Sequence, residues 1–364
     1  MGGHIERVRR AIEFSGPDMV PMDLVDVPFL YDAYGTRASE EVRVPPGAES
    51  FDSAWCTYHW TLREVGRTER GEVLREDEWG CRQVVPADPA SAYSVVARPD
   101  LSTMGKVLSH PWPRPEGTDP FFESRAAAIR RHYPDRFING FIDPGPFLVA
   151  FELLGYEGLL VRLMEEPAAV SEVLRRVVGY QKALIGRFRQ MGAHMITIID
   201  EIAGAGGMMF SPEVFRRDFI GLYRELLEET HRCGMYTSLL LDGNVGAILP
   251  DLLRLDVDVQ LFVQPRSTGL DTLQESYRGK RAVKLAVDMM ETFVRGSPAE
   301  IASEVDDYVR RFHTPRGGLI FQALRWHRPE YDPVRVKAQI EAMNRHRQGV
   351  HEASLGDLDP RSAP

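Results

Sequence analysis

The chain contains little cysteine and no long apolar run. Among its 364 residues there are only three cysteines, Cys56, Cys81 and Cys233. Three thiols cannot form the disulfide framework on which small secreted domains depend, so we expect a reducing compartment. No stretch approaches the ~20 consecutive apolar residues of a membrane-spanning helix. The opening MGGHIERVRRAIEF carries charges where a secretory signal would be apolar. These features predict a cytoplasmic globular protein that binds no membrane.

Positive charge is also scarce. The 44 Lys and Arg residues are outnumbered by 53 Asp and Glu, which gives a formal net charge of -9. A surface that binds nucleic acid needs a basic excess, because it must neutralise phosphates. We therefore expect no nucleic-acid partner and a small molecule as the ligand.

Three motifs of nucleotide-binding proteins and hydrolases are missing. No GxGxxG loop follows a predicted strand, and neither a GxxxxGK[ST] phosphate loop nor a GxSxG nucleophile elbow occurs. The first absence argues against an open doubly wound sheet that binds a dinucleotide. The other two argue against an NTPase and a serine hydrolase.

What the sequence does contain is a regular alternation of helices and short apolar strands. The predicted strands cover residues 20–26, 137–142, 195–199, 236–241, 259–263, 282–287 and 319–321, and we place an eighth within 84–97. Apolar strands separated by helices are typical of a parallel sheet covered on both faces. The sequence therefore predicts an α/β fold, a (β/α)8 barrel, whose usual size of roughly 250 residues rises above ~400 with insertions.

The predicted domain organisation is simple. Residues 1–350 are expected to form a single barrel domain. Within it, 30–115 is irregular and contains too little contiguous apolar sequence for its own core, so we expect loops and short hairpins over the barrel mouth. Residues 351–364 are expected to form a disordered tail.

Polar and mostly acidic residues stand at the ends of the predicted strands. In an α/β barrel the chemistry is located at the carboxyl ends of the strands. Those positions hold Asp23, Asp26, Asp143, Asp200, Glu201, Asp242, Gln264, Asp288 and Gln322, with Asn244 in the turn after Asp242. Carboxylates that share a pocket raise one another's pKa toward the range of acid–base catalysis. Aspartate also caps helices, so capping is the alternative for Asp143, Asp242 and Asp288.

Aromatic and basic residues outside the strands extend the predicted site. They are Trp55, Tyr58, His59 and Trp60 in one aromatic run, Trp79 in the segment DEWG, and Arg325 and His327 after the last strand. The aromatic rings could cover an apolar substrate, Arg325 could supply a cation and His327 a general acid. Burial beneath the insertion, a surface hairpin and a loop on the rim are the structural alternatives.

Cysteine and histidine pairs do not predict a metal site. Cys56 with His59 and His231 with Cys233 have ligand spacing, but the second pair ends a helix at the amino-terminal side of the barrel. That side is opposite to the catalytic face, so we expect no metal there.

An ordered set of short segments spans nearly the whole chain. It comprises 6–12 with Val20-Pro21, 77–80, 151–157 with Glu166-Pro167, Asp200-Glu201 leading through Gly204 and Gly207 to 210–215, Cys233-Gly234, 242–245, Asp288, 296–301 and 317–319. In this order the set resembles the uroporphyrinogen decarboxylase superfamily, and within it the branch with corrinoid-linked methyltransferases. The resemblance implies a barrel enzyme, commonly dimeric, that holds no tightly bound organic cofactor.

Two departures from family patterns restrict the reaction. Uroporphyrinogen decarboxylases carry an Arg-Gln-Ala-Gly-Arg segment near the first strand, whereas residues 22–26 read MDLVD here, which argues against haem-pathway decarboxylation. Thiol-activating methyltransferases of the family carry a segment of the form His-x-Cys-Gly before the asparagine turn, whereas residues 240–243 read LLDG here. Leucine cannot bind zinc, so a zinc–thiolate mechanism is not expected at that position. The chain also lacks an Asp-x-His-x-x-Gly corrinoid segment, so a corrinoid would arrive on a partner protein.

Three hypotheses remain open at this point. The first is a methyltransferase that moves a methyl group from a small methylated or methoxylated donor to a corrinoid on another protein, with Asp200, Glu201, Asp242 or His327 as the general acid. The second is a cofactor-free decarboxylase or lyase for a small carboxylic acid, held by Arg325 or Arg82. The third is a non-catalytic binding barrel. The branch resemblance favours the first.

Overall fold

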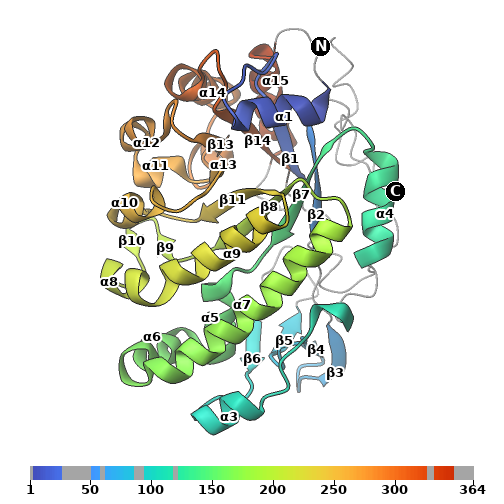
Figure 1. Ribbon diagram of the computed structural model, residues 1–364, viewed down its shortest axis with the longest axis vertical. Helices are drawn as coiled ribbons and strands as arrows, with labels where there is room; N and C mark the ends of the chain where they lie inside the picture. The colour runs from blue at the N-terminus through green and yellow to red at the C-terminus, as the bar shows by residue number, and fades with distance from the viewer. Residues whose placement is uncertain are drawn as a thin grey trace.

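A parallel eight-stranded sheet forms the centre of the computed structural model, which describes residues 3–26, 51–57, 62–85, 94–117, 122–325 and 332–347. The strands are β1 (Met22–Asp26), β2 (Ser53–Thr57), β7 (Phe137–Ile142), β8 (Met195–Asp200), β11 (Tyr236–Leu241), β12 (Val259–Phe262), β13 (Ala282–Ala286) and β14 (Leu319–Arg325). Their order is β1-β14-β13-β12-β11-β8-β7-β2, and β1 also lies against β2. The sheet thus curls into a nearly closed barrel (Figure 1), and the predicted (β/α)8 fold is confirmed.

The eighth strand is not where the sequence placed it. Residues 84–97 contribute to β5 (Arg82–Val85) and β6 (Ser94–Ala97), which join β3 (Arg63–Arg67) and β4 (Val73–Glu76) in an antiparallel sheet. In β5 the exposed Arg82 precedes the buried Gln83, an alternation typical of an antiparallel sheet with one wet face. The eighth barrel strand is β2, which belongs to the segment predicted as an aromatic lid. In Figure 1 the β3–β6 sheet lies at the opposite end of the molecule from α1 (His4–Ile12).

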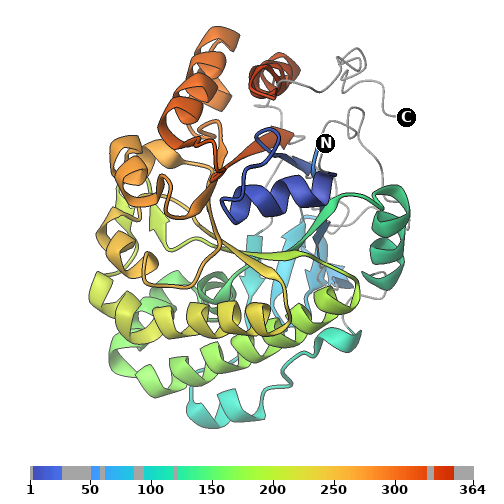
Figure 2. The same cartoon turned by 45° about the horizontal axis from the view of Figure 1, so that its top comes forward.

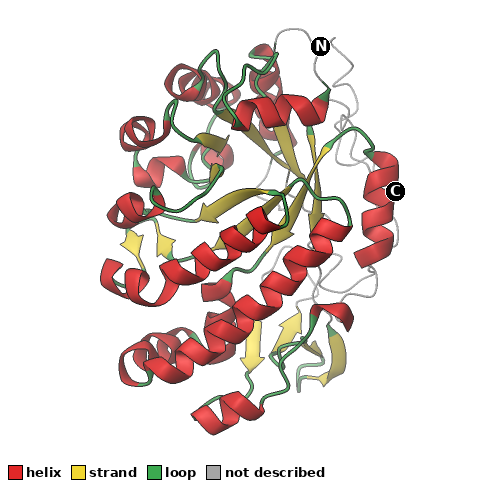
Figure 3. Cartoon of the chain, in the orientation of Figure 1, coloured by secondary structure: helices red, strands yellow, loops and turns green. Residues whose placement is uncertain are grey.

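Helices surround the barrel (Figure 3). Those of eight or more residues after β6 are α4 (Phe122–His132), α5 (Pro146–Leu154), α6 (Tyr156–Glu165), α7 (Pro167–Gln190), α9 (Ile220–Arg232), α12 (Leu270–Tyr277), α14 (Pro298–Phe312) and α15 (Pro333–Arg345). Shorter helices are α3 (Met104–Ser109), α8 (Pro212–Val214), α10 (Leu249–Leu252), α11 (Pro265–Thr268) and α13 (Thr292–Arg295). Within the described residues, none of the helices combines the length and apolarity needed to span a bilayer.

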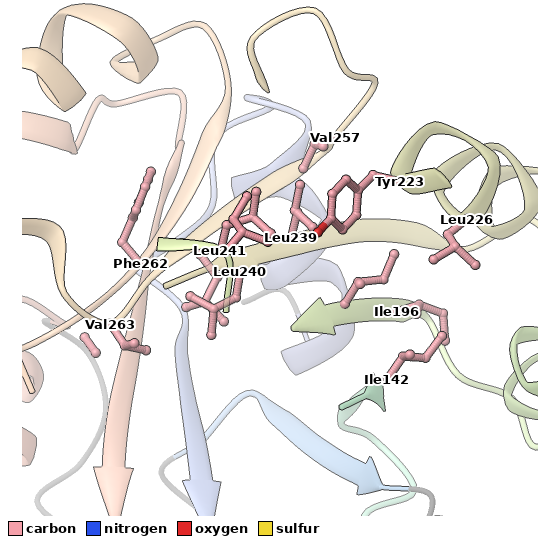
Figure 4. Close-up of a cluster of buried hydrophobic side chains, with 14 of the residues drawn as sticks. Ile142, Ile196, Tyr223, Leu226, Leu239, Leu240, Leu241, Val257, Phe262 and Val263 are labelled. Atoms are coloured by element: carbon pink, nitrogen blue, oxygen red, sulfur yellow. The ribbon is translucent and has the colours of Figure 1, made fainter. Parts of the chain in front are cut away.

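An apolar core fills the space between the strands and the helices. In α7 the buried Val173, Val177 and Leu184 recur at helical spacing, so one face of the helix packs against the barrel. Figure 4 shows another part of this core, which includes Leu239 of β11 and Tyr223 of α9. Burial of such side chains contributes ~25 cal/mol per Å² of apolar surface and is the main stabilising term of the fold.

Helix α1 closes the barrel at the end where the strands begin. Its buried Val8, Ala11 and Ile12 pack on the strand-start residues Phe137, Met195, Val259, Ala282 and Ile320. Figure 2 shows this helix, in dark blue, lying across the strands. The strands finish at the opposite end of the barrel, the end at which Figure 1 shows the β3–β6 sheet.

A buried carboxylate ties α1 and the last helical segment to the barrel. Asp52, just before β2, lies 2.8 Å from His4 Nδ1, 2.5 Å from Arg7 Nη1 and 2.8 Å from Arg347 Nη1. It also accepts the backbone N–H of Met22 at 2.9 Å, which joins β1 to β2. Burial alone would raise the pKa of Asp52, but the His4 hydrogen bond and the charges of Arg347 and Arg7 outweigh it and hold this pKa well below its usual range.

Candidate active site

Three acidic residues lie together at the end of the barrel where the strands finish. Asp143, Glu201 and Asp242 directly follow β7, β8 and β11, which are neighbours in the sheet. Burial raises the pKa of Asp143 to about 7, with further contributions from the charges of Glu201, Asp242 and Asp200. Burial, with the charge of Glu201, also raises the pKa of Asp242 to about 7. The structure therefore brings these three predicted residues into one electrostatically coupled group.

The three carboxyl groups differ in their surroundings. Glu201 is exposed, so the group is open to solvent, although partial burial still raises its pKa. Asp242 Oδ1 is buried and has no hydrogen-bond partner among the described residues. A carboxyl group with an unused oxygen and a pKa near neutrality can exchange a proton with a bound molecule.

Asp200 has a different environment from its neighbours. Its carboxylate accepts the backbone N–H groups of Phe147 at 2.8 Å and Leu148 at 2.9 Å and the hydroxyl of Tyr223 at 2.9 Å. Burial outweighs these bonds and raises the pKa of Asp200 to about 6. The side chain thus holds the first turn of α5 against β8, and its oxygens are already occupied by protein donors.

Asp288 is likewise occupied by backbone donors. It accepts the N–H groups of Arg266 at 3.3 Å, Met290 at 3.1 Å and Glu291 at 3.2 Å, while burial raises its pKa. Its own N–H donates to Glu304 Oε1 at 2.7 Å. Asp288 therefore organises the loop after β13.

Asp23 lies inside the barrel, below the strand ends. Lys284 Nζ is 2.6 Å from Asp23 Oδ2, and Trp55 Nε1 donates to Asp23 Oδ1 at 2.5 Å. The Lys284 Nζ atom also lies 5.2 Å from the centroid of the Trp55 ring, whose edge meets Phe141. We did not predict Lys284 from the sequence. The sequence nevertheless contains an indication of it, a lysine in the middle of the apolar strand AVKLA. A buried cation requires a buried anion, so such a lysine predicts an ion pair inside the barrel.

The predicted amide residues have structural contacts. Gln322 is fully buried; its Nε2 donates to the backbone oxygen of Ala323 at 3.3 Å, while its Oε1 has no partner in the described part of the chain. Gln264 precedes α11 as its N-cap residue. Asn244 Oδ1 accepts the N–H of Gly246 at 3.0 Å and stabilises the turn after β11.

Trp79 is buried beside the acidic group. Its ring centroid lies 4.8 Å from that of Tyr180 and 6.4 Å from that of Trp112. A small pocket there is lined by Trp79, Phe141, Ile142, Asp143, Pro144, Val149, Tyr180, Gln181 and Leu184. It connects the predicted residues Trp79 and Asp143, and it adds Gln181, which we did not predict. Gln181 lies on the core-facing side of α7 between Val177 and Leu184, so a polar residue within an apolar stripe was the available signal.

Several predicted residues cannot be placed. Tyr58, His59, Trp60 and His327 lie outside the described residues, as does the predicted tail 351–364. Arg325 ends β14, but its side chain and that of Asp26 are also outside the description.

The described residues offer no obvious metal centre. Among them, no three His, Cys, Asp or Glu side chains are grouped so as to hold a metal ion. Cys81 is buried, which raises the pKa of its thiol, and its Sγ lies 3.6 Å from the backbone oxygen of Glu152. His231 pairs with Asp258 at 2.8 Å at the end of α9, on the side where β11 begins.

Comparisons with known proteins provide an independent view. Residues 96–346 match the family described as "Uroporphyrinogen decarboxylase (URO-D)". No curated protein matches the chain. A solved structure, "methyltransferase from Methanosarcina mazei", is similar with a TM-score of 0.69 and 15% identity, over 95% of this chain and 99% of that chain. At this identity the similarity concerns the fold.

Two other solved structures are more distant. A B12-independent methionine synthase from Shewanella sp. W3-18-1 has a TM-score of 0.43 and 11% identity, over 78% of this chain and 72% of that chain. An endo-beta-1,4-xylanase from Gloeophyllum trabeum has a TM-score of 0.41 and 10% identity, over 62% of this chain and 81% of that chain. Neither similarity is strong enough to support an argument.

Proposed function

Since the chain belongs to the uroporphyrinogen decarboxylase family, we propose that it is an enzyme of the methyl-transferring branch. It would remove a methyl group from a small methylated or methoxylated donor and pass it to a corrinoid on a partner protein. The observation that carries this proposal is the pair Asp143 and Asp242, each with a pKa raised to about 7. Removal of a methyl group from an ether oxygen needs a proton donor, and such an acid works best when its pKa lies near the operating pH.

The chain's own residues account for the proton in this reaction. The corrinoid would supply the nucleophile that accepts the methyl group. As the carbon–oxygen bond breaks, the donor oxygen keeps the electron pair and takes a proton from Asp242 or Asp143. Asp242 suits this role because its Oδ1 is buried and unpaired within the described structure. We assign the return of a proton from solvent to Glu201, because its side chain is exposed. We propose no tightly bound organic cofactor on the chain itself.

The charge of the site favours this reaction over decarboxylation of a small carboxylic acid. A carboxylate substrate would have to bind beside Asp143, Glu201 and Asp242, and each of these groups that is ionised would repel it. Among the described residues, Lys284 is a cation inside the barrel, and it is already paired with Asp23. The solved structure that shares the fold over 95% of this chain is itself named a methyltransferase, which agrees with the proposal.

The test is methyl transfer to cobalamin(I) from a panel of methoxybenzenes, followed by the absorbance of methylcobalamin. We expect Asp242→Asn to lower kcat/KM by about 10²–10⁴-fold, the usual contribution of a positioned general acid. We expect Asp256→Asn, at a carboxyl group that is 90% exposed, to leave the rate unchanged. Because the proton donor must be protonated, the wild-type rate should fall above pH 7, near the pKa of about 7 of Asp242.

Two results would contradict the proposal. One is the absence of methylcobalamin with every donor. The other is release of carbon dioxide from a small carboxylic acid without corrinoid, which would favour the decarboxylase alternative. A rate that is equal in Asp242→Asn and wild type would remove Asp242 from the proposed role.

A further inference from the structure

The loop that carries Asp143 is fixed against the end of β8. Two residues after Asp143, the N–H of Gly145 donates to the backbone oxygen of Ile199 at 2.6 Å. A Cβ atom on Gly145 would lie 2.7 Å from the carboxyl carbon of Asp200, so the loop packs directly on this side chain. The position of Asp143 therefore depends on that of Asp200.

Asp200 also contacts the backbone around the rest of the acidic group. Its carboxylate accepts two N–H groups of the first turn of α5, at 2.8 and 2.9 Å, and so fixes the other end of the Asp143 loop. The same carboxylate accepts the N–H of Glu201 at 3.2 Å. The backbone oxygen of Asp200 accepts the N–H of Asp242 at 3.2 Å. One residue thus holds the backbone at or beside all three acidic side chains.

The hydroxyl of Tyr223 anchors Asp200 from the layer of helices. It donates to Asp200 Oδ2 at 2.9 Å, and both side chains are fully buried. Tyr223 belongs to the apolar core shown in Figure 4. Phe219, just before α9, packs on Phe147 in the first turn of α5, with 5.6 Å between the ring centroids. The same helical segment therefore supports Asp200 and the turn that Asp200 binds.

These hydrogen bonds also act on the charge of Asp200. Burial raises its pKa, while the backbone N–H groups and the Tyr223 hydroxyl lower it, which leaves it at about 6. Asp200 is therefore mostly ionised at pH 7. Burial is the main cause of the raised pKa of Asp143, followed by the charges of Glu201, Asp242 and Asp200. A change at Asp200 should consequently reach Asp143 through both position and charge.

We propose that Asp200, anchored by the hydroxyl of Tyr223, is a positioning residue that holds Asp143 and Asp242 where they can donate a proton. The inference deepens the proposed function and rests on it only for the identity of the reaction. Asp200 takes no part in the proton transfer itself, because protein donors occupy both of its carboxyl oxygens. Tyr223 acts through Asp200.

The first test measures the titration of Asp143 directly, without corrinoid or methyl donor. The aspartate carboxyl carbons of the full chain are isotope-labelled for NMR, and Asp143→Asn identifies the Asp143 signal. In Tyr223→Phe, Asp200 loses a donor, so its own pKa should rise and its charge at neutral pH should decrease. The pKa of Asp143 should therefore fall below about 7, and looser packing of its loop would lower it further.

Tyr308→Phe is the matched control. Tyr308 is also fully buried, and its hydroxyl also donates to a carboxylate, that of Glu304. Both of these residues lie on α14, so the variant should leave the titration of Asp143 at its wild-type midpoint. Asp200→Asn is the second variant. It removes the charge and one acceptor oxygen, and should also move the midpoint of Asp143 to lower pH.

Methyl transfer provides a second readout. We expect Tyr223→Phe to lower kcat by about 10-fold or more while KM stays nearly unchanged, because the proton donors are displaced and the donor site is not. Tyr308→Phe should keep the wild-type kcat.

An Asp143 midpoint that does not move in Tyr223→Phe would overturn the proposal, and so would an equal shift in Tyr308→Phe or a wild-type kcat in Tyr223→Phe. If Tyr223→Phe does not fold, the titration in Asp200→Asn decides in the same way. If the midpoint shifts as expected while no donor is demethylated by wild type, the positioning role stands and the proposed reaction is wrong.

Discussion

Asp143 and Asp242 are held in surroundings that disfavour their ionised forms. Burial is the main cause for both, and Glu201 adds a like charge. The unfolded chain offers each carboxyl group full hydration, where its pKa is about 3.9. Folding therefore raises the pKa of both groups, and the energetic consequence follows from that difference.

The stability of the fold should depend on this pair in a defined pH window. A group whose pKa rises on folding stabilises the native state below the unfolded value, and this contribution is lost as the pH rises from ~4 through about 7. We expect Asp242→Asn to be more stable than wild type at pH 8, by on the order of a few kcal/mol, and to lose this advantage at pH 4. Thermal unfolding of both proteins at the two pH values measures this difference in stability.

Asp256→Asn is the matched control, because its carboxyl group is 90% exposed. Its stability relative to wild type should change by less than about 1 kcal/mol between the two pH values, because its pair with His231 lies at the surface. If Asp242→Asn behaves in the same way as this control, then Asp242 is not buried in a site that opposes its charge.

At the scale of single residues, the sequence could predict the acidic group and not its surroundings. Asp143, Glu201 and Asp242 follow apolar strands, and parallel strands bring their ends together. Asp200 follows the same rule, yet its side chain holds the start of α5. Which way a strand-end side chain turns depends on packing, which the linear pattern does not contain. The lysine within the apolar strand AVKLA indicates a buried anion, but no local pattern identifies that anion as Asp23, which is 261 positions away.

The turn after β11 determines where Asp242 stands. Gly243 has a φ of 83°, a conformation that side chains of L-residues rarely adopt. A Cβ atom on it would lie 2.4 Å from the backbone oxygen of Ala203. This turn therefore requires glycine for its conformation and for the close approach of the neighbouring strand β9 (Ala203–Gly204).

Substitution of Gly243 by alanine should combine strain with a steric clash. We expect Gly243→Ala to destabilise the fold by about 2–4 kcal/mol, of which the strain of the turn alone is ~1 kcal/mol. We also expect it to lower the rate of methyl transfer, because Asp242 would be displaced. Urea unfolding measures the first effect.

Gly192→Ala separates the two causes. Gly192 has a φ of 87°, but a Cβ atom there would meet nothing within 4 Å. It should show the conformational cost without the clash. Equal losses of stability in the two variants would mean that the backbone moves away from the clash between the new Cβ atom and Ala203 without any further loss of stability.

At the scale of elements, the apolar pattern predicted the barrel strands that consist mainly of apolar residues. It did not predict β2, which lacks a continuous apolar run. β2 reads SAWCT, and two of its five residues, Ser53 and Thr57, are polar. It is buried because α4 and the neighbouring β7 cover it. Burial alternates in the antiparallel strand β5, from the exposed Arg82 to the buried Gln83. The sequence of β5 and β6 alone does not distinguish them from barrel strands.

Asp52 connects parts of the molecule that are distant in sequence. It contacts α1 through His4 and Arg7, β1 through Met22, and Arg347 beyond α15. Removal of one partner from a buried ion pair leaves the opposite charges without compensation. This is among the most destabilising changes a single substitution can make.

We expect Asp52→Ala to destabilise the whole domain by about 3–5 kcal/mol, because the buried Arg347 would lose its ion pair with Asp52. Arg7 would lose the same partner and keep its pair with Asp18. Folding lowers the pKa of Asp52, so its contribution is present above the unfolded pKa and is lost as the pH falls below it. The acid side of the wild-type stability profile should therefore flatten in the variant. Denaturant titrations between pH 3 and 7 would measure this.

Asp135→Asn provides the comparison, since Asp135 lies 3.9 Å from the same His4 but is 63% exposed. Its effect should stay below ~1 kcal/mol, as for most surface ion pairs. A loss of stability in Asp52→Ala no larger than this would show that Asp52 does not hold the two ends of the domain together.

The packing of α1 on Phe137, Met195, Val259, Ala282 and Ile320 closes the end of the barrel where the strands begin. Under the proposed function, the donor, the demethylated product and the corrinoid protein would therefore all approach the acidic group from the other end, where Glu201 is exposed. A large carrier seated there would obstruct the passage, so the small donor has to load first and its product can depart only after the carrier withdraws. Initial-rate measurements should then show compulsory-order binding, with the donor before the carrier protein. Random-order binding would contradict this sequence of binding and release.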